Sequence, residues 1–120
     1  MHIEHIALWT RDLERLRAFY QTHFGATAGP RYESASRPFA SYFLTFTTGA
    51  RLELMHTAGV EPAGNGHFAV STGSREAVDR LTAELRRAGV PIVGEPRTTG
   101  DGYYESVVAD PDGNLIEITV

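Results

Sequence analysis

Apolar residues recur along this chain in two patterns: every second residue in several short runs, and every third or fourth residue in two longer stretches. Alternating runs are typical of β-strands, and the longer pattern is typical of amphipathic helices. The first strand-like run covers residues 3–9, and the helical stretch after it begins at Asp12 and ends at Gly25. Asp is a common N-cap and Gly commonly follows a helix, so these two residues mark the ends of the expected helix.

The second half of the chain repeats this order. A strand-like run at residues 66–71 precedes a helical stretch that begins at Ser74 and is ended by Gly89. In both halves the N-cap follows a His by seven residues, at His5 in the first half and at His67 in the second. The matching order and spacing predict an internal duplication, so we expect the two halves of the chain to have the same fold.

Three further strand-like runs, rich in aromatic and β-branched residues, follow each helical stretch. They lie at residues 27–32, 39–47 and 51–56 in the first half and at 92–98, 103–109 and 115–120 in the second. Each half therefore has the order β-α-β-β-β, and we expect a single α+β domain with modules at about residues 1–57 and 66–120. One helix cannot cover both faces of a sheet in a module of about sixty residues, so two modules should pair, within or between chains.

One His and one Glu of each module fall on the strand face that points away from the helix, because side chains alternate across a strand. They are His5 and Glu53 in the first module and His67 and Glu117 in the second. A carboxylate within an apolar sheet is costly unless it is paired or bound to a cation. Two imidazoles and two carboxylates suit Zn, Ni, Co, Mn or Fe(II) and leave coordination positions open. The pattern predicts a shared metal site; the alternative is that each residue is structural or solvated.

Composition and charge narrow the function classes. The net charge is −4, and all eleven cations are Arg, scattered without a basic stripe, which disfavours nucleic acid and anionic membranes as partners. The absence of Cys excludes disulfides, thiolate metal sites and a cysteine nucleophile. No signal-peptide pattern or membrane-spanning run is present, so we expect a cytoplasmic protein. The open coordination positions of the expected metal site predict a small-molecule substrate that chelates the metal.

Five short motifs carry a resemblance to the vicinal-oxygen-chelate superfamily, which includes glyoxalase I, bleomycin-resistance proteins, extradiol dioxygenases, methylmalonyl-CoA epimerases and fosfomycin-resistance thiol transferases. The motifs are Glu4-His5-Ile6-Ala7-Leu8, Asp12-Leu13-Glu14-Arg15, Phe19-Tyr20, Gly66-His67-Phe68-Ala69-Val70 and Asp110-Pro111-Asp112-Gly113-Asn114-Leu115-Ile116-Glu117. The resemblance implies that two modules form a curved, partly open mixed sheet around one divalent metal. It also implies assembly as a homodimer, since modules from different subunits often complete each site.

The two-His, two-Glu set is most similar to that of bacterial glyoxalase I. The resemblance implies that Glu117, aided by Glu53, moves a proton between adjacent carbons of an alpha-oxo or hemithioacetal-like compound through an enediolate. Three positions that hold glutathione in glyoxalase I, two Arg and one Asn, correspond here to Trp9, Thr57 and Ala63. Glutathione is therefore not implied as part of the substrate.

Three further residues are candidates for substrate binding. Trp9 shares its strand face with His5 and predicts an aromatic wall, or else ordinary core packing. The loop from Arg97 to Tyr104 could close over the site and bind an anionic group through Arg97, or could be a plain surface loop.

Two alternative functions stay open. One is a non-catalytic protein that binds or sequesters an antibiotic or another small molecule, in which a metal would only anchor the ligand. The other is a metal-dependent thiol transferase of the fosfomycin-resistance type. Those transferases usually bind metal with two His and one Glu and have Thr where this chain has Ala7, so Glu53 would be surplus.

Overall fold

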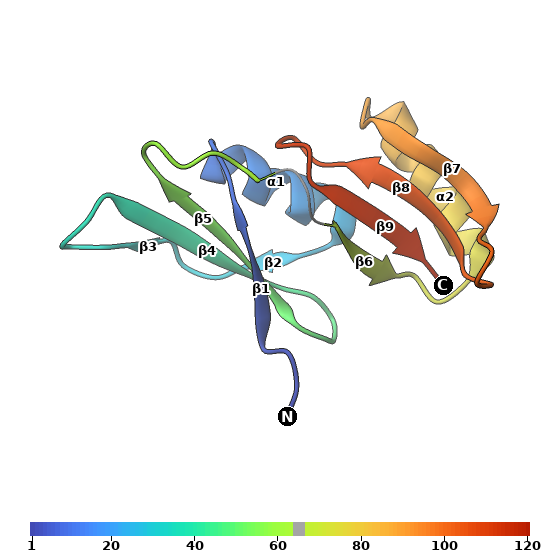
Figure 1. Ribbon diagram of the computed structural model, residues 1–120, viewed down its shortest axis with the longest axis horizontal. Helices are drawn as coiled ribbons and strands as arrows, with labels where there is room; N and C mark the ends of the chain where they lie inside the picture. The colour runs from blue at the N-terminus through green and yellow to red at the C-terminus, as the bar shows by residue number, and fades with distance from the viewer. Residues whose placement is uncertain (64–66) are drawn as a thin grey trace. The chain divides into compact units, whose positions relative to one another are not determined.

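The computed structural model describes residues 1–63 and 67–120 of the chain. The chain divides into two compact units, Met1–Ala63 and Gly64–Val120, each with one helix and its own sheet (Figure 1). The expected strand start at Gly66 lies outside the described residues. The architecture is the α+β arrangement expected from the duplicated pattern, with two open sheets of mixed strands.

The first unit consists of a helix and a five-stranded sheet. Its elements are β1 (His5–Trp9), α1 (Leu13–Phe24), β2 (Thr27–Ala28), β3 (Tyr32–Glu33), β4 (Phe39–Thr45) and β5 (Arg51–Thr57). The strand order is β1-β5-β4-β2, with β3 also paired to β4. Only β1 and β5 run parallel among these pairs. The run expected at residues 27–32 is two short strands, because Pro30 has no N–H for the ladder and interrupts it.

The second unit repeats this plan with a four-stranded sheet. Its elements are β6 (His67–Ser71), α2 (Arg75–Arg87), β7 (Ile92–Thr98), β8 (Tyr104–Ala109) and β9 (Leu115–Thr119). The strand order is β6-β9-β8-β7, and β6 runs parallel to β9. In both units the first strand therefore lies beside the last, which brings the His-bearing strand next to the Glu-bearing strand.

Local sequence determines where both helices begin. The Asp12 side chain accepts a hydrogen bond from the backbone N–H of Arg15 at 3.0 Å, and Ser74 accepts one from Ala77 at 3.2 Å. Each side chain satisfies one of the backbone N–H groups that a helix leaves without a partner. Helix α1 ends at Gly25, whose φ of 65° lies in the left-handed region that favours glycine. These N-caps were predicted correctly.

The core of each unit lies between its helix and one face of its sheet. Buried side chains of α1 pack against Leu52 and Leu54 of β5, and those of α2 pack against Ile116 and Ile118 of β9. Thr82 of α2 is polar but belongs to this core, with 1% of its surface exposed, whereas its apolar neighbour Leu81 is only half-buried.

Thr82 can lie in the core because its hydroxyl group makes two hydrogen bonds there. It donates to the carbonyl of Val78 at 2.7 Å and lies 2.7 Å from the buried Ser106 hydroxyl of β8. Replacing Thr82 by Val should lower the free energy of unfolding by about 1–3 kcal/mol, because the Ser106 hydroxyl loses its acceptor inside the core. Urea denaturation followed by circular dichroism measures this. Adding Ser106→Ala should recover part of the loss, and a double variant no better than the single one would contradict the assignment.

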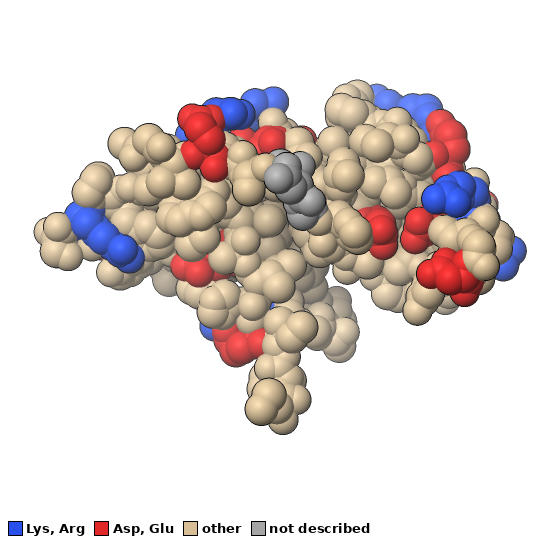
Figure 2. Space-filling model, in the orientation of Figure 1, with Lys and Arg blue, Asp and Glu red and all other residues tan. Residues whose placement is uncertain are grey.

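Charged side chains of both signs are interspersed on the face shown in Figure 2. Several arginines lie in exposed ion pairs, such as Arg31 with Glu14 at 3.0 Å and Arg86 with Glu95 at 2.5 Å. Such exposed pairs contribute little to stability. Within the described part of the chain, no helix is both long and apolar enough to cross a membrane.

Candidate functional site

His5 and Glu53 form a pair on the open face of the first sheet. In the parallel register of β1 and β5, Ala7 lies opposite Glu53, and His5 is two residues before Ala7 on the same face. The Nε2 atom of His5 lies 3.8 Å from Oε2 of Glu53. The Glu53 side chain is 15% exposed, whereas Leu52 and Leu54 on the other face are buried against the helix.

His67 and Glu117 form the same pair in the second unit. Ala69 lies opposite Glu117 in the parallel register of β6 and β9, as Ala7 lies opposite Glu53. The Nε2 atom of His67 lies 3.3 Å from Oε1 of Glu117. Each unit thus builds one imidazole–carboxylate pair from its first and last strands, on the face that the sequence predicted.

The turn before β9 positions Glu117. Asp110 is buried, and its Oδ1 accepts hydrogen bonds at 2.9 Å from the backbone N–H groups of Asp112 and Asn114. Its Oδ2 accepts a third from the side-chain amide of Asn114 at 2.7 Å. Gly113 has a φ of 85°, which a residue with a side chain rarely adopts. This closed turn sets the register of β8 and β9 and thereby the face on which Glu117 lies.

The distances within both pairs suit two donors to one ion. Nitrogen and oxygen ligands each lie about 2.0–2.2 Å from a metal such as zinc, so two of them are about 2.9–4.3 Å apart, depending on the angle at the metal. The separations of 3.3 and 3.8 Å fall within that span. Among residues 1–63 and 67–120, no three His, Asp or Glu side chains form a group that could hold a metal. The structure therefore brings the four predicted ligands together as two pairs.

Glu4 forms a hydrogen bond with Nδ1, the other ring nitrogen of His5. Its Oε2 lies 2.5 Å from Nδ1 of His5, and its Oε1 accepts a hydrogen bond from the Arg51 guanidinium. The hydrogen bond with His5 and then the contact with Arg51 lower the pKa of the Glu4 carboxyl, although its burial opposes this. When Nδ1–H donates to this carboxylate, Nε2 carries the lone pair and faces Glu53, as in carboxylate–histidine–metal arrangements. No pattern in the sequence indicated this contact of Glu4.

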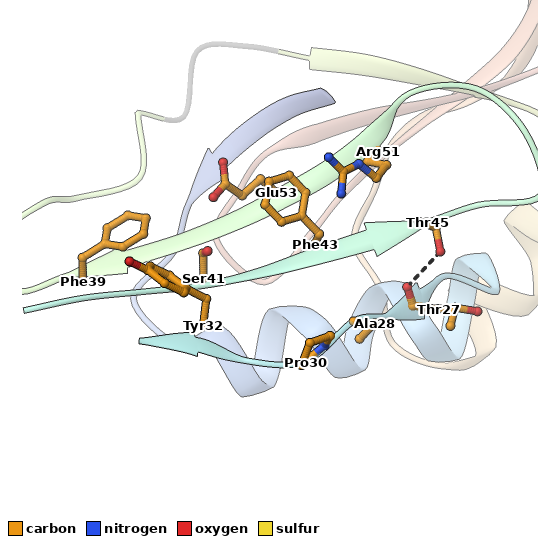
Figure 3. A pocket seen from close by; sticks show the side chains of 11 residues that line it. Thr27, Ala28, Pro30, Tyr32, Phe39, Ser41, Phe43, Thr45, Arg51 and Glu53 are labelled. Carbon is orange, nitrogen blue, oxygen red and sulfur yellow. Dashed lines mark hydrogen bonds between the residues drawn. The ribbon is translucent and has the colours of Figure 1, made fainter. Parts of the chain in front are cut away.

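A cavity of about 570 Å³ lies on the same face of the first sheet as Glu53. Figure 3 shows its residues, several of them aromatic. The lining residues include Tyr32, Phe39, Ser41, Phe43, Arg51 and Glu53. In the sheet register Phe43 lies opposite Glu53, and its ring centroid is 5.3 Å from that of His5. The pocket therefore adjoins the His5–Glu53 pair.

The three aromatic residues that line this pocket, Tyr32, Phe39 and Phe43, were not among the predicted site residues. Phe39 and Phe43 alternate along β4 as Arg51 and Glu53 do along β5, so alternation was a usable signal. What the sequence does not show is that β4 pairs with β5 in a register that puts Phe43 beside Glu53.

Trp9 lies near this pocket. It is half-buried, shares the face of His5, and stacks edge-on against Phe39 with ring centroids 6.2 Å apart. Phe39 itself lines the cavity. Trp9 thus contacts one residue of the aromatic wall and is not itself a lining residue of the cavity.

The two other expected substrate residues lie in the second unit. The guanidinium of Arg97 is 63% exposed and 3.9 Å from the carboxylate of Glu105. The Tyr104 hydroxyl donates a hydrogen bond to Asp79 of α2 at 2.7 Å, and this contact raises the pKa of Tyr104. Tyr104 therefore lies on the helix side of its sheet, opposite the face that carries Glu117, and the structure does not bring the two together.

Comparison with known proteins identifies the family to which this fold belongs. The model of the Glyoxalase/Bleomycin resistance protein/Dioxygenase superfamily matches residues 2–118. Glyoxalase I from Zea mays is 25% identical with a TM-score of 0.82, over 98% of this chain and 44% of the maize chain. This chain thus spans less than half of the maize protein's length. No curated protein matches it in sequence.

Two further solved structures are similar over nearly their whole length. The trypanothione-dependent glyoxalase I of Leishmania major is 25% identical with a TM-score of 0.80, over 99% of this chain and 86% of that one. A possible glyoxalase from Bacillus cereus is 26% identical with a TM-score of 0.78, over 100% of this chain and 99% of that one. These matches confirm the resemblance inferred from the motifs, and the chain belongs to the Glyoxalase/Bleomycin resistance protein/Dioxygenase superfamily.

Proposed function

We propose that this protein is a divalent-metal-dependent lyase or isomerase of the glyoxalase type, acting on a small compound with two vicinal oxygens. The observation that carries the proposal is the repeated pair: each unit sets an imidazole Nε2 within 4 Å of a carboxylate, by the same parallel register. Similarity to solved glyoxalase I structures supports it.

His5, Glu53, His67 and Glu117 would hold one ion, of Ni, Zn, Co, Mn or Fe(II). Neutral imidazole and carboxylate suit these metals. When bound, such an ion polarises vicinal oxygens and stabilises negative charge that develops on them. Each unit supplies only two donors, so the site needs both units, from one chain or from two chains of a homodimer.

Glu117 is the proposed base. Its carboxylate would take a proton from the carbon next to a carbonyl and return it to the adjacent carbon, which isomerises the substrate without any oxidant or reductant. For a hemithioacetal this exchange yields a hydroxy thioester with the same atoms. Glu53 occupies the equivalent place in the first unit and would assist the transfer.

The proposal is tested with methylglyoxal and a small thiol. Protein stripped of metal and reloaded with Ni, Co, Zn or Mn should form thioester, followed by its absorbance, and EDTA should stop the reaction. A reaction rate that does not depend on the metal would contradict the proposal. So would the lack of thioester with every metal and every small alpha-oxo compound tried.

Glu4 should matter for metal affinity although it is not a ligand. Replacing Glu4 by Gln weakens the hydrogen bond that orients His5, and loss of such a partner typically lowers metal affinity about 10- to 100-fold. Competition with a chromophoric chelator measures the affinity. Glu61→Gln is the matched control, because Glu61 is also an exposed carboxylate bonded to an arginine, Arg11. Equal affinities in the two variants would contradict the role of Glu4.

A non-catalytic binding protein is the second candidate, and the pocket beside Glu53 favours it, since a cavity of about 570 Å³ suits a small ligand with or without chemistry. The two functions differ in their response to a chelator. A sequestering protein that holds its ligand by the pocket alone would bind equally well in EDTA, whereas the proposed enzyme should lose both binding and turnover.

A further inference from the structure

Three of the residues that line the pocket are aromatic, Tyr32, Phe39 and Phe43. Phe39 and Phe43 extend from β4 and Tyr32 from β3, and the rings of Tyr32 and Phe39 lie 6.2 Å apart (Figure 3). Trp9 stacks against Phe39 on the same face. Aromatic rings in a cavity of this size favour an apolar, flat group, which they contact by stacking and edge contacts.

Among the described residues that line the pocket, no cation is left without a partner; Arg37, whose guanidinium lies 4.6 Å from the ring centroid of Phe39, is not one of these lining residues. Arg51 is the one cation among the described residues that line it. The Arg51 guanidinium is bonded to Glu4 and lies 4.2 Å from the ring centroid of Phe43, so its charge is already engaged by a carboxylate and an aromatic face. Glu53 lines the same cavity, and in the proposed function its charge is used to hold the metal. A carboxylate on the non-reacting part of the ligand would therefore find no free cationic partner among the described lining residues.

From these two observations we infer that the pocket beside Glu53 selects a substrate whose non-reacting part is an uncharged aromatic group, rather than an anionic thiol peptide. The inference rests on the proposed function, because the vicinal oxygens of this substrate are held by the metal. It adds that Phe39 and Phe43 determine specificity. A neutral ring beside Phe43 lies next to Glu53, which places the reacting carbons of the same molecule at the His5–Glu53 pair.

Three hydroxamic acids test the inference, because each presents two vicinal oxygens to a metal. Benzohydroxamic acid carries a neutral ring, acetohydroxamic acid lacks the ring, and 4-carboxybenzohydroxamic acid carries a charged one. Calorimetric titration of the nickel-loaded protein measures the affinity for each probe. Phe39→Ala should lower the affinity for benzohydroxamic acid by roughly fivefold or more and change the affinity for acetohydroxamic acid by less than about twofold. The carboxylated probe should bind the unaltered protein no more tightly than benzohydroxamic acid.

Two variants accompany Phe39→Ala. Phe43→Ala should have the same effect, so the result does not depend on one side chain. Tyr42→Ala is the matched control, because Tyr42 is next to Phe43 in β4 but lies on the helix side, where its hydroxyl bonds Glu14. It should change the affinity of neither neutral probe. Circular dichroism establishes that each variant is folded.

The outcomes separate this inference from the proposed function. If the nickel-loaded protein binds neither neutral hydroxamic acid, the metal site fails and the inference fails with it. If both probes bind and neither Phe variant distinguishes them, the metal site stands and the aromatic selection is wrong. Tighter binding of the carboxylated probe would show that Arg51 is free to receive an anion and would likewise overturn the inference.

Discussion

Replacing Glu117 by Gln is expected to lower kcat for the glyoxalase-type reaction by about two to four orders of magnitude, the range that a positioned general base contributes. The amide keeps an oxygen donor and the size of the side chain but cannot take a proton at neutral pH. The metal should stay bound, and KM should change far less than kcat. Steady-state kinetics on the metal-loaded variant, with metal content determined on the same sample, measure both effects.

The matched control is Glu105→Gln. Glu105 lies on the neighbouring strand β8, on the same face as Glu117, and its side chain is similarly sheltered, at 14% exposed against 27%. Its carboxylate lies 3.9 Å from Arg97 and has no role in the proposed chemistry. This variant should keep its kcat within about threefold, since substitutions away from the reacting groups act through small shifts in stability. Equal losses in both variants, or full activity of Glu117→Gln with metal bound, would remove Glu117 as the base.

The second large effect is expected from His5→Ala. Loss of one imidazole from a four-ligand site should lower the metal affinity by several orders of magnitude, because each ligand contributes directly to the metal-binding free energy, which is about 10–16 kcal/mol in structural zinc sites. Dialysed protein should then retain close to no metal by plasma mass spectrometry. Turnover should fall with the metal content and return only at high metal concentration.

His23→Gln is the control for this experiment. His23 lies in the last turn of α1, with its ring 5.1 Å from that of Phe19, and belongs to neither His–Glu pair. Metal content should equal that of the unaltered protein. If His5→Ala also retains a full complement of metal, the ion is held elsewhere and the pair is structural.

The face on which each of the four His and Glu side chains lies was accessible from sequence because it depends only on local alternation, whereas their meeting in pairs depends on the pairing of β1 with β5 and of β6 with β9. Alternation along a strand decides the face of Glu53 between Leu52 and Leu54, and the same alternation decides the face of Glu117 between Ile116 and Ile118. The helix starts at Asp12 and Ser74 are equally local, since each cap bonds a backbone N–H three residues away.

Other features depend on pairing between strands that are distant in sequence. Tyr104 stands in a stretch that looks like an active-site loop, yet the register of β8 puts it on the helix side, where Asp79 supplies a partner. Phe43 gains its place beside Glu53 only through the register of β4 against β5. Glu4 reaches both His5 and Arg51 because β1 and β5 are neighbours, which no local pattern indicates.

The number of imidazoles bound to each metal ion tests the central claim most directly. X-ray absorption spectroscopy of the nickel-loaded protein measures this number from scattering by the imidazole rings. A single ion held by both His–Glu pairs predicts two imidazoles per nickel, with oxygen donors completing the shell. One imidazole per nickel would mean that each pair binds separately, and none would mean that the pairs bind no metal. Either result would contradict the account.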